Sequence, residues 1–265
     1  PRGNLNPQMV RVPGILVDAV VVDENQKQAT GIDYDPAVSG EMKKPVAKLE
    51  AVPLNMEKVL ARRALMALCP GDVVNLGFGI PSLISSVAAE EGLIDRIYFT
   101  IEHGAIGGVP LSGLQFGAAF NPEAIIDSAS QFDFLTGGGI SAAAMAFAEV
   151  DGEGNVNVSR LNKMPHVLSG AGGFIDILNS VRRIIFCGTL TAGGIQAEVR
   201  DGRLKILKEG RVIKWVREIQ HRTFDAAFAR EKGQEVIYLT ERAVFRSHSG
   251  GLVLTEAAPG IDVGR

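Results

Sequence analysis

From residue 72 onward the chain alternates short apolar runs with helical segments, and this alternation constrains the fold more than any other feature. Apolar runs occupy residues 73–76 and 97–101, and a helix is expected between them at 81–90. Strands that alternate with helices build a mainly parallel sheet with helices on both faces. The sequence therefore predicts an α/β fold with an open, mostly parallel sheet.

Other segments extend this prediction. Further strands are expected at three places: 183–187, 235–239 and 251–255. A helix capped by Asn55 is expected over 56–69, because apolar residues recur there at helical spacing and Pro70 follows. The runs at 204–208 and 211–215 flank a Glu-Gly pair and predict an additional exposed hairpin.

Three regions are expected along the chain. Residues 1–22 contain an apolar run at 10–22 that is typical of a strand, and we interpret them as the end of a preceding domain. Residues 23–45 are polar and rich in turn residues, which favours a linker. Residues 46–265 hold the alternating pattern and form the main domain.

Composition limits the possible partners. The formal net charge of -3 implies no basic surface for nucleic acid or anionic lipid, so a small molecule or a protein is the expected partner. The two cysteines give neither a disulfide framework nor metal-ligand spacing. No signal peptide and no membrane-spanning run are recognised, so a cytoplasmic location is expected.

Glycines gather where predicted strands end. In open α/β sheets such positions leave backbone amides directed into a ligand crevice, although each cluster alone would more often be a simple turn. Four clusters together favour one shared crevice: Gly77 and Gly79 in 75–82, Gly104 in 99–110, the glycines of 136–141, and Gly170, Gly172 and Gly173 in 169–176.

Glu102 stands where an apolar strand breaks into a glycine-rich loop. A carboxylate in this position suits a general base or a nucleophile, and a structural glutamate that caps nearby amides is the alternative. His103 need not meet it, because neighbours on a strand point to opposite faces. The other reactive candidates, Cys187, His166, His221 and His248, are expected to be structural or on the surface.

These clusters resemble the motifs of the family I coenzyme A transferases, which move CoA from an acyl-CoA to a free carboxylate. Residues 77–81 look like the Gly-x-Gly-Ile-Pro loop of that family, 100–108 like its catalytic glutamate loop, and 169–173 with Asp176 like its downstream glycine loop. Segments 121–127, 131–134 and 187–194 are similar to the single-chain acetate, propionate or 3-ketoacid CoA-transferase branch. The resemblance covers residues 46–262 and identifies the carboxyl-terminal half.

The resemblance implies a mechanism and a set of partners. Glu102 would attack an acyl-CoA thioester and carry CoA as a glutamyl-CoA thioester. Gly172 and Gly173 would supply an oxyanion donor, Gly77 and Gly79 would lie near the CoA chain, and Gly170 and Gly104 are further oxyanion or CoA-binding candidates. CoA is a substrate, with no metal and no permanently bound cofactor. The implied partners are a short-chain acyl-CoA, a carboxylate (acetate, propionate or a 3-keto acid), an amino-terminal half and further copies in a homo-oligomer.

Two departures and three alternatives accompany the resemblance. First, Glu102-His103-Gly104 replaces the usual Glu-Asn-Gly or Glu-Ser-Gly, which would change the surroundings of the glutamate or the pH profile of the reaction. Second, family members of this branch are about twice as long as this chain. A nicotinamide or flavin oxidoreductase is disfavoured because Ser82 stands where the third glycine should be. A CoA-ester hydrolase with the same glutamate, or a CoA-binding half without activity, stays open.

Overall fold

The computed structural model describes residues 4–161 and 170–262, and it divides into two units, 1–34 and 35–265. The first unit contains two 3₁₀ turns, η1 (Pro7–Met9) and η2 (Gly14–Leu16). Its apolar run at 17–22 joins no sheet within the described part of this unit, and Val21 is 92% exposed. A strand requires a hydrogen-bonded neighbour, so the strand expected here is not formed. The assignment of residues 1–22 to a preceding domain stays a prediction.

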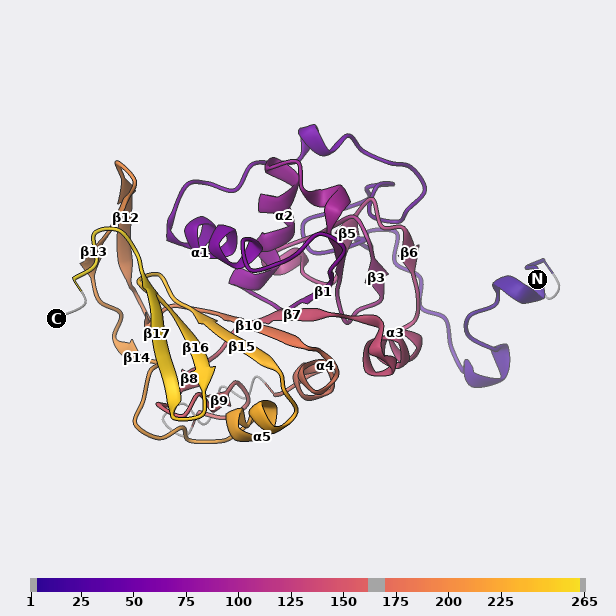
Figure 1. Cartoon of the computed structure of the whole chain (residues 1–265). Coiled ribbons are helices and arrows are strands. Elements are labelled where there is room, and N and C mark those ends of the chain that lie inside the picture. Colours follow the sequence, from indigo (N-terminus) through magenta and orange to yellow (C-terminus); the bar gives the residue numbers. More distant parts are fainter. Residues whose placement is uncertain (1–3, 162–169, 263–265) are drawn as a thin grey trace. The chain divides into compact units, whose positions relative to one another are not determined.

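The second unit is built on one nine-stranded sheet (Figure 1). Its strands are, in spatial order, β17 (Gly251–Ala257), β16 (Ala243–His248), β15 (Glu235–Leu239), β10 (Arg183–Cys187), β7 (Ala142–Met145), β1 (Val73–Leu76), β2 (Tyr98–Thr100), β3 (Ala105–Ile106) and β6 (Ala124–Ile125). The five central strands, β15 to β2, run parallel, and on each side two further strands are added by antiparallel pairing. The predicted α/β fold is confirmed, but the sheet is mixed because only its centre is parallel.

Helices cover both faces of this sheet (Figure 1). The α-helices are α1 (Met56–Leu65), α2 (Leu83–Glu90), α3 (Ser128–Phe134), α4 (Phe174–Ser180) and α5 (Ala226–Glu231). Side chains alternate along each parallel strand: in β10, Ile185 packs in the core that contains α1 and α2, and Ile184 packs in the core that contains α4 and α5. The two cores hold the sheet from both sides, and the alternation keeps the central strands apolar throughout.

The start of α1 follows the sequence prediction, and its end does not. The Asn55 Oδ1 atom accepts a hydrogen bond from the Lys58 amide at 2.9 Å, as expected of an N-cap. The helix ends at Leu65 rather than Cys69. Pro70 has no N–H to donate to the Met66 carbonyl and disfavours a helical conformation at Cys69, so the last turn loosens early.

The hairpin predicted from 204–208 and 211–215 is wrong. Four two-stranded sheets accompany the large one: β12 (Gln196–Arg200) with β13 (Arg203–Lys208), β11 (Thr191–Ala192) with β14 (Val212–Ile213), β4 (Val109–Pro110) with β5 (Ala119–Phe120), and β8 (Glu149–Val150) with β9 (Val156–Asn157). Asp201 and Gly202 connect β12 to β13 with φ values of 50° and 70°. These are the dihedrals of the two-residue turn that fits antiparallel strands, so the Asp-Gly pair sets the pairing.

The remaining turns are short. They are η3 (Val46–Lys48), η4 (Ile80–Ser82), η5 (Ile94–Arg96), η6 (Gly113–Gln115) and the π-helical turn η7 (Leu135–Gly139). The helix expected over 81–90 corresponds to η4 followed by α2. Residues 35–45, within the predicted linker, pack on this unit, since Ala37 is 2% exposed and its carbonyl accepts from the Asn121 amide. Among the described residues, no helix is long and apolar enough to cross a membrane.

Candidate active site

Three parallel neighbours, β7, β1 and β2, end at the same edge of the sheet. The segments that follow them line a cavity of about 470 Å³. Phe78 follows β1, Glu102 follows β2 and Phe147 follows β7, and all three line this cavity. A crevice at the carboxyl ends of parallel strands is where ligands bind in open α/β sheets.

Glu102 lies in the tight turn between β2 and β3. The Gly104 amide donates to the Ile101 carbonyl at 3.1 Å, and Gly104 has a φ of 109°, which side chains with a Cβ rarely adopt. The Gly104 Cα also faces the Ile126 carbonyl oxygen, where a Cβ would overlap it. The Glu102 side chain is half-buried, and no hydrogen bond or ion pair joins its carboxylate to another described residue. A carboxylate without such partners keeps its lone pairs available.

The glycines at 172 and 173 meet this carboxylate. Oε2 of Glu102 occupies the space that a Cβ on Gly173 would enter, and Oε1 lies 3.7 Å from the Cβ position of Gly172. The ring of Phe132 packs on Gly173 from α3. The structure therefore brings together Glu102 and the two glycines that the sequence predicted beside it, from positions about 70 residues apart.

The other predicted glycines divide into two groups. Gly77 and Gly170 line the cavity of Glu102. Gly79 and Gly104 are absent from its described lining: Gly79, with a φ of 85°, precedes η4 with open space around its Cα, and Gly104 is buried in the turn. For all of these glycines, a role in binding CoA or an oxyanion stays a prediction.

The glycine cluster at 136–141 lies elsewhere, so the expectation of one crevice shared by all four clusters is wrong. Gly139 packs against the ring of Phe134, and no residue of the cluster is in the described lining of the cavity. The reason is topological. This cluster precedes β7 and therefore lies at the amino end of that strand, whereas Gly77 and Glu102 follow theirs.

Asn75, which sequence reasoning named only as part of the first loop, lines the same cavity from β1. It is 1% exposed, and its Oδ1 atom has no hydrogen-bond partner in the described structure. An unpaired buried amide oxygen is uncommon, because desolvation without a partner destabilises the fold. An asparagine within the apolar run Val-Val-Asn-Leu is the sequence signal that identifies it.

Gln131 was missed as a residue of the site. It is fully buried on α3, and its Nε2 atom donates to the Thr100 hydroxyl at 2.7 Å and to the Ile101 carbonyl at 3.1 Å. These bonds hold the end of β2 next to Glu102. The Gln131 Oε1 atom, like Asn75 Oδ1, has no partner among the described residues. Thr100, which accepts from Gln131, is the register neighbour of Asn75 on β1.

The remaining candidates lie as follows. His103 is exposed, and its ring packs edge to face on Phe116 with centroids 5.4 Å apart, without a hydrogen bond to Glu102. Cys187 is fully buried, and burial raises the pKa of its thiol, which confirms it as a core residue. His221 Nδ1 lies 2.9 Å from the Ser159 hydroxyl, His248 ends β16, and His166 lies outside the described residues.

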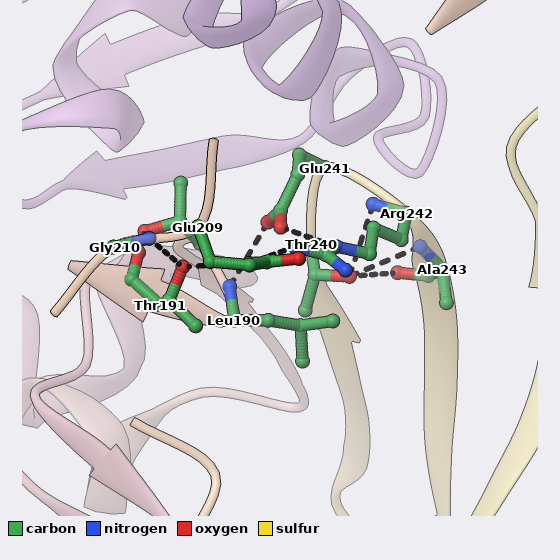
Figure 2. Close-up of polar contacts among 9 residues, drawn as sticks. Leu190, Thr191, Glu209, Gly210, Thr240, Glu241, Arg242 and Ala243 are labelled. Carbon is green, nitrogen blue, oxygen red and sulfur yellow. Dashed lines mark hydrogen bonds and ion pairs between the residues drawn. The ribbon is translucent and has the colours of Figure 1, made fainter. Parts of the chain in front are cut away.

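A buried carboxylate, Glu241, is at the centre of a group of polar contacts between loops (Figure 2). Glu241 accepts from the Leu190 amide at 2.9 Å and from Arg242 Nε at 2.8 Å, and Arg242 also binds Glu209 at 2.6 Å. The Gly210 amide donates to the Thr191 hydroxyl at 2.9 Å. These contacts join three chain segments, 190–191, 209–210 and 241–242, into one rigid support.

Lys214 lies between this support and the cavity wall. Its Nζ is 4.2 Å from the centroid of the Phe147 ring, and no described residue forms an ion pair or hydrogen bond with it. Burial lowers the pKa of Lys214 to about 8, while the charge of Glu241 opposes the shift. The charge of Glu241 and the face of the Phe147 ring are thus the described groups that favour the ammonium.

We expect Lys214→Met to raise the free energy of unfolding at pH 7 by about 2 kcal/mol, because a buried ammonium is removed. This difference in the free energy of unfolding between variant and parent should become smaller as the pH rises from about 8 toward 10.5. In this window the folded protein releases the Lys214 proton while the unfolded chain keeps it, so the stability of the parent chain rises with pH. Denaturant unfolding of both proteins from pH 7 to 10 measures the difference. A gain that is constant over this range would contradict the assignment.

Taken together, the site is a carboxylate in a largely apolar cavity, beside a glycine loop at the start of a helix. Such an arrangement suits covalent acyl chemistry, in which a carboxylate is the nucleophile and backbone amides stabilise the oxyanion. This class of site agrees with the comparisons with known proteins.

No family model matches the chain. Among curated proteins, the acetate CoA-transferase YdiF of Escherichia coli O157:H7 is 46% identical over 263 residues, which are 99% of this chain and 49% of that protein. Caffeate CoA-transferase of Acetobacterium woodii is 43% identical over 268 residues, 99% of this chain and 51% of that protein. The acetate CoA-transferase subunit beta of Haemophilus influenzae is 29% identical over 225 residues, 79% of this chain and 87% of that subunit.

Solved structures agree with these relatives. The thioester complex of the Escherichia coli O157:H7 acyl-CoA transferase YdiF with CoA matches with a TM-score of 0.86 and 44% identity, over 100% of this chain and 48% of that one. The chain spans about half the length of the first two curated relatives. Over nearly its whole length the chain is similar to family I CoA-transferases, and within that family it is β-subunit-like.

Proposed function

We propose that Glu102 is the nucleophile of a CoA-transferase that moves CoA between an acyl-CoA and a free carboxylate. The observation that carries this proposal is the position of the Glu102 carboxylate directly against Gly173 and near Gly172, in a cavity where no described residue neutralises it. A carboxylate is a weak nucleophile in water and becomes effective when it is desolvated and positioned. Gln131 supports the position, because it holds the carbonyl of Ile101, the residue before Glu102.

The reaction proceeds by double displacement. A Glu102 oxygen attacks the thioester carbonyl, the C–S bond breaks, and CoA leaves as a thiolate from a glutamyl-acyl anhydride. The thiolate then attacks the Glu102 carbonyl carbon and expels the donor acid as a carboxylate, which leaves a glutamyl-CoA thioester. The acceptor carboxylate runs these two steps in reverse and regenerates Glu102. No water is consumed, and neither oxidation nor reduction takes place.

Each attack creates an oxyanion that requires hydrogen-bond donors in place before the reaction. The backbone amides at Gly172 and Gly173 are the donors that we propose, because these residues are the ones in contact with the Glu102 carboxylate. Asn75 is a further candidate, since its buried side chain lines the same cavity. We propose that Gly77 and Gly170, which line this cavity, bind the pantetheine chain of CoA.

The relatives support the reaction class and leave the acyl group open. One is named for acetate and another for caffeate, at similar identity to this chain. The sequence resemblance predicts acetate, propionate or a 3-keto acid. We therefore propose a free carboxylate as the acceptor and CoA as a substrate, with no permanently bound cofactor.

We also propose that an amino-terminal half completes the active site. The first two curated relatives are about twice as long as this chain, whereas the β subunit from Haemophilus influenzae is covered over 87% of its length. A two-part enzyme, joined in one chain or assembled from two, accounts for both matches. The chain alone would then bind CoA without turnover.

The test uses the chain together with its amino-terminal half, with an acyl-CoA and a ¹⁴C-labelled carboxylate. Label that appears in CoA ester supports transfer, and thioester loss without labelled product would indicate a hydrolase. Borohydride reduction after incubation with acyl-CoA should convert Glu102 to the alcohol, detected by peptide mass spectrometry. An unmodified Glu102 peptide from an enzyme that turns over would contradict the covalent assignment.

A further inference from the structure

The cavity around Glu102 is unusually aromatic for a site expected to handle acetate. Glu102 is the one charged side chain in its described lining. Four phenylalanines line it: Phe78, Phe116, Phe147 and Phe174. Apolar walls favour apolar ligands, because binding removes the apolar surface of both from water, which is energetically favourable.

One part of the wall is a series of rings packed edge to face. The Phe78 and Phe116 centroids lie 5.6 Å apart at an interplanar angle of 80°, and His103 meets Phe116 at 5.4 Å and 89°. Phe78 is 61% exposed, although it belongs to the cavity lining. A large exposed ring held in place by its neighbours is preorganised to receive an apolar partner.

The Phe147 part of the wall is held from behind. Phe147 is 3% exposed, Lys214 lies over its ring, and Trp215 packs edge to face on it with centroids 6.2 Å apart. The Lys214 backbone bonds to Leu190 and Val150, so Phe147 rests on a fixed support. Phe147 is therefore packed from behind, on the side away from the cavity.

The acyl group enters this cavity by the chemistry of the reaction. In the anhydride it is covalently joined to the Glu102 carboxylate, so it must lie among the side chains around Glu102. The pantetheine chain carries two amides that need hydrogen-bond partners, which glycine backbone offers and phenylalanine rings do not. An apolar acyl group, which carries no amide, is the better match for the aromatic walls. At about 470 Å³, the cavity is in the size range of pockets that bind molecules much larger than acetyl.

We propose that the enzyme prefers a flat, apolar acyl group of the size of 3-phenylpropanoyl to acetyl or propanoyl. This inference rests on the proposed function, since it concerns the acyl group carried past Glu102. The expected preference is large, because burial of one phenyl ring contributes about 1.5–3 kcal/mol, or a factor of ten or more.

The test compares acceptors in the enzyme assembled with its amino-terminal half, using the same acyl-CoA donor. We expect kcat/KM for 3-phenylpropanoate to exceed that for acetate and propanoate by at least tenfold. Phe78→Ala should lower this ratio about fivefold, mainly through KM, because it removes an aromatic surface without touching Glu102. Phe228→Ala is the matched control: Phe228 is 50% exposed on α5 and absent from the cavity lining, so the ratio should not change.

The possible outcomes test the acyl-group preference separately from the proposed CoA-transferase function. Equal or faster transfer to acetate or propanoate would overturn the inference and leave the CoA-transferase assignment standing. A Phe78→Ala enzyme with an unchanged ratio would also contradict it. Absence of transfer to every acceptor would contradict the proposed function, and this inference with it.

Discussion

Replacing Glu102 with glutamine is expected to lower kcat for CoA transfer by at least about 10⁴-fold, because an amide cannot form the anhydride. The fold should persist. Glutamine has the same shape, and no described residue forms a hydrogen bond or an ion pair with the Glu102 carboxylate. The measurement is the rate of CoA transfer, with thermal unfolding of both proteins as the structural comparison.

A matched control distinguishes loss of the nucleophile from loss of charge. Glu198 is exposed on β12, far from the cavity lining, so Glu198→Gln removes one carboxylate without touching the site. Its kcat should equal that of the parent. Retention of more than about a hundredth of the parent rate by Glu102→Gln would reject Glu102 as the nucleophile and return the general-base hypothesis.

Gly173→Ala is expected to lower kcat/KM by at least about 100-fold, because the new methyl group would enter the space of the Glu102 carboxylate and the Phe132 ring. Backbone strain is not the cause. The φ of Gly173 is -76°, which alanine adopts readily. Displacing the nucleophile by about 1 Å is enough for such a loss.

The control for this prediction is Gly137→Ala. Gly137 lies in the glycine cluster before β7, where a Cβ would meet nothing within 4 Å and φ is not positive. Its kcat/KM and melting temperature should match those of the parent. If Gly173→Ala kept full activity, the contact between the glycine loop and Glu102 would be irrelevant to the reaction.

The sequence predicted the strands of the sheet better than their connections. The bounds of β10 and β15 agree with the apolar runs at 183–187 and 235–239, because both strands are buried on two faces and read as continuous apolar segments. The hairpin predicted around Glu209 is wrong because the two runs pair with other strands. The run at 204–208 belongs to β13, which pairs with β12 through the turn at Asp201 and Gly202, and the dihedral angles of this turn determine the register.

The residues alone predicted that Glu102 and the glycine clusters lie at a ligand crevice, and the family resemblance singled out Gly172 and Gly173 as partners of Glu102. The structure places both glycines next to the Glu102 carboxylate. Gln131 was not predicted because its role depends on α3 packing against the end of β2, which no local pattern encodes. The sequence also did not predict which glycine clusters share the cavity. That depends on the direction of each strand, which is a property of the whole sheet.

The two orphaned acceptors of the site, Asn75 Oδ1 and Gln131 Oε1, have an evolutionary consequence. An unpaired buried acceptor destabilises the fold by about 1–3 kcal/mol unless a water or a ligand donates to it. Gln131 cannot be exchanged for leucine without loss, because its Nε2 atom also holds Thr100 and Ile101. The end of β2 is therefore shaped by the needs of the site as well as by stability. Stabilising substitutions in this protein should accordingly be sought away from the end of β2.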